Sequence, residues 1–275
     1  MLINTFSHIP GIGPATEGKI WNEGIRTWED ISKQPGSSNR KTLAIRKGIQ
    51  ESIHQLKIGN AKYFEDLLPA NQHFRLFPEF RNSCVFLDIE TTGLSTTDAI
   101  TTIAMYDGRS IKYYVQGQNL NDFLNDIQKY QVLITYNGKT FDLPFIQAYF
   151  NCQLPHAHID LRYILKSLGL KGGLKKCEKA MGIDRQELDG VDGYFAVLLW
   201  KEYQRTNNPK ALDTLLAYNI EDVINLETLM IKAYNLKIKG TCFSTTHVIP
   251  ELPKAPNPFK ADRQVIQKLK SIFYQ

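Results

Sequence analysis

Cysteine is scarce in this sequence, and none of it is paired. The four cysteines lie far apart with no C-x-x-C spacing, which argues against a zinc cage or a redox dithiol. No apolar run approaches the ~20 residues that a membrane span needs. The first residues, MLINTFSHIPGIG, have neither the basic nor the apolar region of a leader peptide. We therefore expect reduced cysteines that serve packing, no contact with a membrane and a cytoplasmic location.

The charge of the chain is small in sum but uneven along its length. The 275 residues carry a formal net charge of +5. Residues 1–82 hold 11 basic and 8 acidic side chains, residues 83–231 hold 14 and 18, and residues 232–275 hold 8 and 2. An acidic middle between basic flanks suits a polyanion that is guided toward a centre where cations intervene. Uneven surface charge without a function explains the same pattern.

The order of the patterns predicts four parts. Apolar residues at helical spacing predict a helical domain over residues 1–68, and the Pro-, Phe- and Arg-rich residues 69–82 predict a linker. From Ser83 the segments SCVFLDIE, ITTIAMY and SIKYYVQG predict a three-strand meander, followed by helices and a further strand, VLITYN, in a domain that ends near residue 238. Residues 239–275 form a basic tail with four closely spaced prolines and a short helix at 261–273.

The N-terminal segment FSHIPGIGPATEGKIW predicts a short apolar helix, a tight turn at Gly11 and Gly13, and a second helix with Pro14 in its first turn. This resembles a helix-hairpin-helix unit. In that family the hairpin presents backbone N–H groups to a DNA phosphate without recognising sequence. The resemblance implies phosphate contacts at Gly11 and Gly13, and a purely structural helical cap is the alternative.

The strand VFLDIETTGL contains two carboxylates that a buried strand does not normally accept. Alternation places Asp88 and Glu90 on one face of the strand. Two like charges there raise each other's pKa and destabilise the fold unless a cation lies between them. A divalent metal ion is the simplest such cation. The polar turn at residues 91–93 would let a substrate backbone approach closely.

Two later segments add candidate partners. ITYNGKTFDLPFI predicts a strand followed by a helix that starts near Asp142, where an ordinary helix cap is the simplest local interpretation. NNPKALDTLLAYNIED begins a helix at Asn208 and Pro209 and places Tyr218 and Asp222 one turn apart on one face. Taken alone, such a pair is more often a surface pair than part of a site.

Taken together, D-I-E-T-T-G, N-G-K-T-F-D and Y-N-I-E-D resemble the three motifs of the DEDD exonuclease superfamily, with its ribonuclease H-like fold. The tyrosine in the third motif is similar to the DEDDy branch. Within that branch, the segments HIDLRYILK, GGLKKCEKAMGIDRQELDG and YNIEDVINLE resemble the YprB-like predicted exonucleases. The likeness covers roughly residues 83–231. It implies an α/β fold with a mixed β-sheet flanked by helices, beside a small all-α N-terminal domain.

The resemblance also implies different roles for the residues of the site. It makes a metal-binding set of Asp88, Glu90, Asp142 and Asp222, with Tyr218 orienting the attacking water. Four carboxylates without a basic ligand suit hard cations, so we expect two Mg²⁺ or Mn²⁺ ions ~3.5–4 Å apart. We assign contacts with the nucleic acid to Thr91, Thr92, Gly93, Leu94, Asn137 and Phe141.

Other polar residues are ambiguous. Asp160 matches a recurrent aspartate of the family, and a helix cap explains it as well. His156 and His158 have no cysteine nearby, so we do not assign them to a metal. Lys171, Lys175 and Lys176 fit phosphate contacts and a solvated helix face equally well.

The sequence therefore predicts a 3′–5′ exonuclease that releases nucleoside monophosphates, with DNA favoured over RNA because of the hairpin. The alternative is a non-catalytic or partner-dependent nucleic-acid-binding protein on a nuclease fold. That alternative is disfavoured because clustered carboxylates without a cation destabilise a fold. A site that no longer bound metal ions would therefore be expected to lose some of its carboxylates. The absence of a polymerase-sized region disfavours a proofreading subunit, and protein partners stay open.

Overall fold

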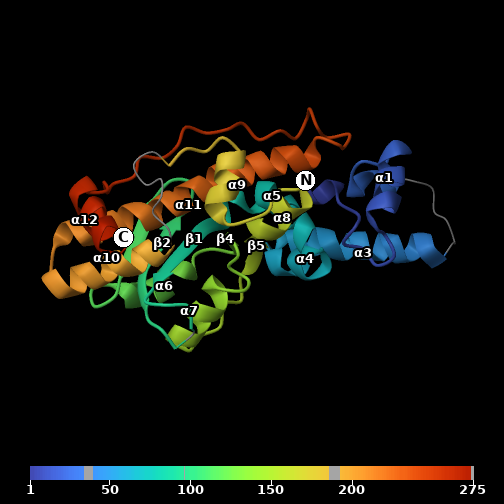
Figure 1. The fold of residues 1–275 in the computed structure, drawn as a ribbon. Coiled ribbons are helices and arrows are strands. Elements are labelled where there is room, and N and C mark those ends of the chain that lie inside the picture. The colour runs from blue at the N-terminus through green and yellow to red at the C-terminus, as the bar shows by residue number, and fades with distance from the viewer. Residues whose placement is uncertain (34–39, 96, 186–192, 274–275) are drawn as a thin grey trace.

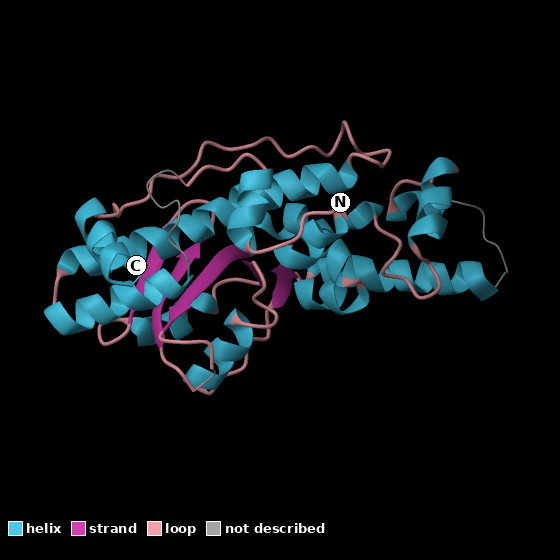
Figure 2. Cartoon of the chain, viewed as in Figure 1, coloured by secondary structure: helices cyan, strands magenta, loops and turns pink. Residues whose placement is uncertain are grey.

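The structure is a computed structural model that describes residues 1–33, 40–95, 97–185 and 193–273. Figure 1 shows an elongated molecule with a β-sheet and its helices toward one end and the N-terminal helices toward the other. At that N-terminal end lie α1 (Pro14–Asn22), α2 (Trp28–Lys33), α3 (Arg40–Lys57) and α4 (Ala61–Leu67). Figure 2 shows that all strands belong to the sheet half, and that the N-terminal part is helical.

The sheet is mixed, as the sequence predicts. Its five strands are β1 (Cys84–Thr91), β2 (Ile100–Tyr106), β3 (Ile111–Val115), β4 (Val132–Thr135) and β5 (Ala157–Asp160), in the order β3-β2-β1-β4-β5. The meander of β1, β2 and β3 is antiparallel, whereas β4 and β5 continue the sheet in parallel. The α/β fold class is thereby confirmed. The short strand β5 was not among the predicted strands.

Strand alternation divides the core between the two faces of the sheet. Phe86 of β1 contributes to the core on one face, where α8 (Leu161–Ser167), α10 (Gly193–Thr206) and α11 (Pro209–Ile238) pack. Leu87 contributes to the core on the other face, under α6 (Phe123–Ile127) and α7 (Asp142–Phe150). In Figure 1, α11 runs along one side of the sheet and α6 and α7 lie on the other. Because side chains alternate along a strand, Asp88 and Glu90 point to the same face of the sheet as Phe86, toward α11.

Helix α11 is the longest of the described elements and carries Tyr218 and Asp222 of the candidate site. It begins as the sequence predicts, with the Asn208 side chain accepting from the Lys210 N–H and Pro209 in its first turn. Most of its side chains are buried, because it packs against β1 and β2 on one side and against α10 and the tail on the others. A buried helix can carry polar side chains only where they have partners.

The N-terminal segment differs from its prediction. A three-residue 3₁₀ helix, η1 (Leu2–Asn4), and a turn stand where a short apolar helix was expected. The Glu17 carboxylate accepts the N–H groups of Phe6 and Ser7 at 2.7 and 3.0 Å, which removes those donors from any helix. Gly13 caps α1 with Pro14 in its first turn, and Gly11 has a φ of +84°. The hairpin resemblance stays a prediction.

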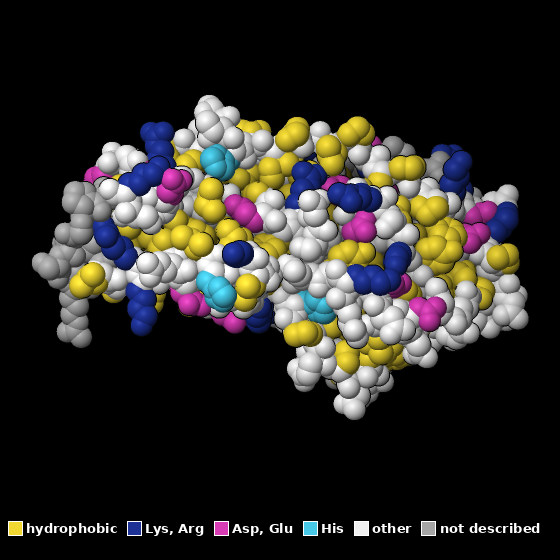
Figure 3. All heavy atoms as spheres, turned by 180° about the vertical axis from the view of Figure 1, so that it is seen from behind, with side chains coloured by type: hydrophobic (Ala, Val, Ile, Leu, Met, Phe, Trp, Pro, Cys, Tyr) yellow, Lys and Arg dark blue, Asp and Glu magenta, His cyan; other side chains and the backbone are white. Residues whose placement is uncertain are grey.

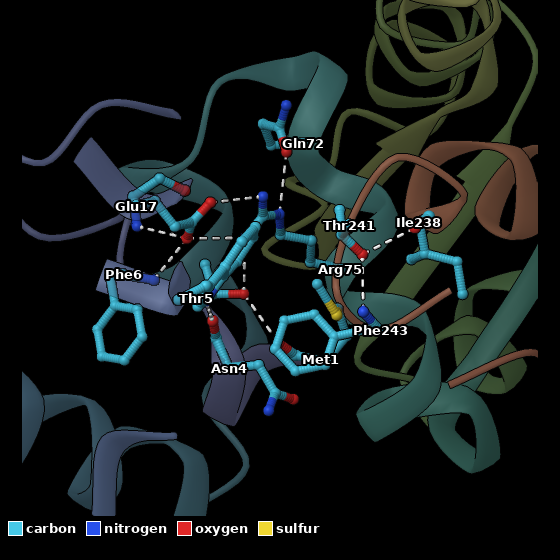
Figure 4. Close-up of polar contacts among 12 residues, drawn as sticks. Met1, Asn4, Thr5, Phe6, Glu17, Gln72, Arg75, Ile238, Thr241 and Phe243 are labelled. Atoms are coloured by element: carbon cyan, nitrogen blue, oxygen red, sulfur yellow. Dashed lines mark hydrogen bonds and ion pairs between the residues drawn. The ribbon is translucent and has the colours of Figure 1, made fainter. Parts of the chain in front are cut away.

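The stretch 69–82 is helical and packed. It consists of η2 (Ala70–Leu76), α5 (Phe77–Phe80) and η3 (Arg81–Ser83), with Phe74 and Phe77 buried. Arg75 of η2 forms a buried bidentate ion pair with Glu17 of α1, and Figure 4 shows the two side chains pointing at each other beside Thr5 and Phe6. These contacts tie the N-terminal helices to the sheet region, and the division into domains stays a prediction.

The tail runs back along the molecule. Figure 1 shows it passing from the end of α11 along that helix to α12 (Arg263–Phe273), which lies beside α10. Asn257 donates to the carbonyl of Ala217 at 2.8 Å, and Lys254 forms an ion pair with Glu221, so both residues fix the tail to α11. The remaining elements are η4 (Leu120–Asp122) and α9 (Leu174–Ala180).

The surface mixes charges of both signs. On the face seen in Figure 3, lysine and arginine side chains stand in small groups among aspartate, glutamate and apolar side chains. That face therefore presents no continuous basic surface. Within the described parts of the chain, no helix is both long and apolar enough to cross a membrane.

Candidate functional site

Three carboxylates from two elements meet beside the sheet. Asp88 and Glu90 come from β1, and Asp222 comes from α11, which packs against that strand. Each offers an oxygen atom, and these three atoms lie within 4.8 Å of one another. The strand alternation and the helical spacing thus bring together three of the four predicted metal ligands.

Asn219 locks this arrangement across the two elements. Its side-chain amide donates to Asp88 Oδ2 at 2.7 Å, and its oxygen accepts from the Thr102 hydroxyl of β2 at 3.0 Å. Both Asn219 and Thr102 are fully buried. The sequence analysis missed Asn219, although a polar residue between Tyr218 and Asp222 in a buried helix was a usable signal.

The fourth predicted carboxylate, Asp142, lies in the same cleft but outside the group of three. It is the first residue of α7, and the preceding Phe141 holds the cap position, so Asp142 is not an ordinary N-cap. Burial raises the pKa of its carboxyl, and the backbone N–H groups of Asp142 and Ile89 oppose that rise. Asp142 thus adds an acidic group from α7 to the cleft that Asp88 and Glu90 of β1 line.

The environment of the four carboxylates disfavours their charges. Removal from water, followed by the charge of Asp222, raises the pKa of Asp88 and of Glu90 well above the usual range. Burial raises the pKa of Asp142 to about 7 and that of Asp222 to about 6. Because four like charges share one cleft, a cation among them would stabilise all of them.

Tyr218 lies in the same cleft as a neutral phenol. Burial, together with the charges of Asp222 and Glu90, raises its pKa well above 10. Two cations flank its ring, with Lys175 Nζ 4.8 Å and Arg185 Cζ 5.8 Å from the ring centre. A phenol held in this state donates a hydrogen bond rather than accepting a proton.

Arg185 adds a buried cation that the sequence analysis did not anticipate. Its Nη1 lies 2.5 Å from Asp222 Oδ1, and its Nε donates to Glu178 Oε2 at 2.5 Å. The Arg185 side chain is only 5% exposed. No local pattern indicated the contact with Asp222, because the two residues lie far apart in the sequence.

The carboxylates and Tyr218 line a cleft of about 470 Å³. Six of the eight residues assigned to nucleic-acid contact also line it, namely Thr91, Thr92, Gly93, Leu94, Asn137 and Phe141. Leu94 is 88% exposed at its edge. A Cβ at Gly93 would lie 2.4 Å from Asp98 Oδ2, so a larger residue there would require the Asp98 side chain to move.

Asp160 holds the loop after β4 in place. It caps α8 by accepting from the Arg162 N–H, and it also accepts the N–H groups of Asn137 and Lys139 at 2.8 and 3.1 Å. Asn137 adopts a φ of +67° in that loop. Asp160 therefore positions a cleft residue and does not line the cleft itself.

Other predicted positions lie elsewhere. Gly11 and Gly13 line a separate hollow of about 500 Å³ in the N-terminal part. His158 is hydrogen-bonded to the Thr135 hydroxyl, and His156 to a backbone carbonyl, so both have structural partners away from the carboxylates. Helix α10 adds cleft residues that we did not predict, among them the exposed Tyr194 and Lys201.

The donor set suits a hard divalent cation. Asp88, Glu90 and Asp222 offer only oxygen atoms, which Mg²⁺ and Mn²⁺ prefer. Asp222 Oδ1 is buried and makes no hydrogen bond with the described residues, although Arg185 lies against it. The cluster can therefore hold a metal ion, with Asp142 close enough to add its charge to the site.

The comparison with protein families decides the class of the chain. The model of a family described as RNase_H superfamily matches residues 85–234, more than half of the chain. The chain belongs to the RNase_H superfamily. The matched segment runs from β1 through most of α11 and contains every carboxylate of the cleft.

Two individual proteins to which the chain is similar are distant from it. The "Uncharacterized protein YprB" of Bacillus subtilis (strain 168) is 29% identical over 175 residues, covering 55% of this chain and 42% of that protein. The chain thus spans less than half of the relative's length. The family B DNA polymerase of Pyrobaculum calidifontis matches with a TM-score of 0.42 and 16% identity over 61% of this chain and 27% of the polymerase.

Proposed function

We propose that this chain is a metal-dependent 3′–5′ exonuclease of the DEDDy type. The observation that supports it most is the meeting of Asp88, Glu90 and Asp222 within 4.8 Å, in a cleft that also contains Asp142 and Tyr218. Members of the RNase_H superfamily are usually nucleases, and the matched segment contains this cluster. Beyond the nuclease class, we propose the direction of digestion from the 3′ end, the release of nucleoside monophosphates, and the residues that bind the metal ions.

In the proposed reaction the four carboxylates hold two Mg²⁺ or Mn²⁺ ions. When bound, such ions neutralise charge on the phosphate and make water a stronger nucleophile. The Tyr218 hydroxyl donates to the attacking water and orients it toward phosphorus. The water oxygen would form a bond to phosphorus while the bond to the 3′-oxygen of the preceding nucleotide breaks. The water would release one proton to solvent, and the leaving 3′-oxygen would take up one proton from solvent. The products are a nucleoside 5′-monophosphate and a shortened strand with a 3′-hydroxyl.

The rim of the cleft would hold the end of the strand. Leu94 and Phe141 offer apolar surface against which a base can stack, and Asn137 offers a polar side chain beside it. The backbone of Thr91, Thr92 and Gly93 lies close enough to the carboxylates to approach a sugar or phosphate. We favour DNA as the substrate because Gly11 and Gly13 precede a helix that starts with Pro14, as in hairpins that bind DNA phosphates.

The test is digestion of single-stranded DNA and RNA of the same sequence with Mn²⁺ by the wild type and by Asp88→Asn and Tyr218→Phe. We expect metal-dependent degradation by the wild type, at least ~100-fold less by Asp88→Asn, and a lower kcat at similar KM for Tyr218→Phe. Intact DNA and RNA in all metal and salt conditions would contradict the proposal.

A second function is favoured by one observation. Arg185 already supplies a positive charge to Asp222, so the cluster is partly neutralised without a metal ion. A non-catalytic nucleic-acid-binding protein could keep its carboxylates in this way. Thermal unfolding separates the two functions, because Mn²⁺ should raise the Tm of a metal-binding enzyme and leave that of a binding-only protein unchanged.

A further inference from the structure

A second hollow lies beside the carboxylate cleft. It has a volume of about 580 Å³ and is formed by α9 and the turn that follows it. The lining residues are Lys175, Lys176, Glu178, Lys179, Gly182, Ile183, Asp184 and Arg185. Four of these eight side chains are basic and two are acidic, so the hollow has an excess of positive charge.

The positive charge of the hollow is only partly neutralised. The Glu178 carboxylate is buried and accepts from Arg185 Nε at 2.5 Å. Lys176 and Lys179 are exposed, and neither has an acidic partner among the described residues. Two lysines on one short helix that face a shared hollow attract an anion more strongly than isolated surface lysines.

Arg185 points to a ligand independently of the lysines. Its side chain is 5% exposed, and its Nη2 has no hydrogen-bond acceptor among the described residues. A buried guanidinium donor without an acceptor destabilises the protein, and an anion oxygen in the hollow would satisfy it. Arginine is well suited to phosphate because its donors form a fixed fork.

The hollow and the cleft share a wall. Arg185 lines the hollow, and its Nη1 lies 2.5 Å from Asp222 Oδ1 in the cleft. Lys175 also lines the hollow, and its Nζ lies 4.8 Å from the ring centre of Tyr218. A chain of phosphates that has one member at the carboxylates can therefore place a neighbouring member in the hollow.

We propose that the α9 hollow is a phosphate subsite for the substrate strand, binding a backbone phosphate on the 5′ side of the bond that is cleaved. This proposal rests on the proposed nuclease function and names how that nuclease holds its strand. Lys176, Lys179 and the free edge of Arg185 bind the phosphate oxygens. The subsite distinguishes a polynucleotide from a single nucleotide, because only the polynucleotide has a second phosphate.

The experiment compares two substrates of different length. One is a 5′-labelled single-stranded DNA oligonucleotide, and the other is thymidine 5′-(p-nitrophenyl phosphate), whose single phosphodiester cannot reach a second subsite. The variant is Lys176→Gln/Lys179→Gln, and the charge-matched control is Lys239→Gln/Lys260→Gln, which changes two exposed lysines outside the hollow. Circular dichroism checks that both variants fold.

The quantity compared is kcat/KM for the oligonucleotide divided by kcat/KM for the ester. We expect this ratio to fall about tenfold in the hollow variant, Lys176→Gln/Lys179→Gln, and to stay unchanged in the control. The slope of log KM for the oligonucleotide against log salt should fall by about 0.7, since the subsite binds one phosphate and each phosphate contact on a single strand contributes about 0.7. An unchanged ratio, or an equal loss on both substrates, would overturn the subsite.

Failure of the proposed function would be seen separately. If the wild type hydrolyses neither substrate, the nuclease proposal is wrong, and the hollow is judged by fluorescence anisotropy with the same oligonucleotide. Weaker binding by the hollow variant than by the control would then support the subsite. Equal binding by the two variants would overturn it.

Discussion

At the scale of single residues, the carboxylates of the cleft differ in the groups that lie next to them. Asp222 lies 2.5 Å from the Arg185 guanidinium, whereas the partner of the Asp88 carboxylate among the described residues is the neutral Asn219 amide, at 2.7 Å. The pKa of Asp222 is accordingly raised only to about 6, although the carboxylate is buried. The pKa of Asp88 is raised well above its usual range. The same neutralising substitution should therefore have opposite effects at the two positions.

We predict that Asp88→Asn stabilises the metal-free protein by about 1 kcal/mol, or about 2–4 °C in Tm, because it removes one of several repelling charges and keeps an acceptor for Asn219. Asp222→Asn should destabilise it by up to about 3 kcal/mol, because Arg185 loses a buried partner. Denaturant unfolding in EDTA measures both. Changes of the same sign and size in the free energy of unfolding of the two variants would show that the contact with Arg185 does not distinguish Asp222 from Asp88.

Two buried histidines should make stability depend on pH. Burial lowers the pKa of His8 to about 4 and that of His158 to about 3, below the usual 6.5. Between the lowered and the usual pKa the unfolded chain binds more protons than the folded protein. The free energy of unfolding is therefore highest above pH 6.5 and falls as the pH falls through this window.

For His8 alone we predict a loss of about 2 kcal/mol between pH 7 and pH 5, since one pKa unit corresponds to about 1.4 kcal/mol. His8→Gln should remove about that much of the pH dependence in urea unfolding at the two pH values. The control is His54→Gln, at an exposed position of α3. Equal pH dependence in the wild type and in His8→Gln would contradict the assignment.

At the scale of elements, one buried ion pair connects the N-terminal helices to the sheet region. Arg75 of η2 donates to both oxygens of Glu17 in α1, at 2.9 and 2.8 Å, and its guanidinium lies 5.6 Å from the centre of the Trp21 ring. Glu17 also accepts two backbone N–H groups of the turn before α1. The pair thus orders both the turn and the junction.

We predict strong coupling between these two residues. Arg75→Met and Glu17→Gln should each destabilise the protein by about 3 kcal/mol, because each leaves a buried charge unpaired, and the double variant should lose clearly less than the sum. A double-mutant cycle in urea measures the coupling, with the exposed pair Lys33 and Glu29 as a reference expected to give under about 1 kcal/mol. Additive losses would show that the buried pair does not act as a unit.

The sequence predicted the elements whose patterns are long and regular. The meander and the start of α11 follow from alternation and capping, whereas the mixed sheet was implied by the resemblance of the three motifs. The approach of Asp222 to Asp88 and Glu90 follows once α11 packs on β1. The strand β5, AHID, has two polar residues among its four, whereas the equally short β4, VLIT, consists mainly of the apolar and β-branched residues that are typical of a strand. The contact of Arg185 with Asp222 depends on tertiary packing between distant segments, which no local pattern contains.

At the scale of the whole molecule, one hydrophobic core joins the N-terminal helices, one face of the sheet and the tail. Trp21 and Trp28 near the N-terminus, Trp200 of α10 and Leu269 of α12 are all buried in it. The tail adds a contact of its own, because the Phe243 ring packs edge-on against Trp21 with ring centres 5.2 Å apart. A shared core of this kind couples the unfolding of the parts that it joins.

We predict that both ends of the molecule unfold together. The three tryptophans allow the test, since Trp200→Phe leaves fluorescence only in the N-terminal part, and Trp21→Phe/Trp28→Phe leaves it only in α10. Within each variant, the urea midpoint by fluorescence should equal that by far-UV circular dichroism. An earlier fluorescence transition in the Trp200→Phe variant would show that the N-terminal helices unfold independently.

The central claim is that the carboxylate cleft removes nucleotides from the 3′ end. The most direct measurement follows one DNA strand, labelled at the 5′ end in one sample and at the 3′ end in another, with Mn²⁺ and either the wild type or Asp88→Asn. We predict a ladder that shortens step by step from the 5′-labelled strand, immediate release of labelled mononucleotide from the 3′-labelled strand, and neither with Asp88→Asn. Internal fragments from both strands, or products that persist in Asp88→Asn, would contradict a 3′–5′ exonuclease at this cleft.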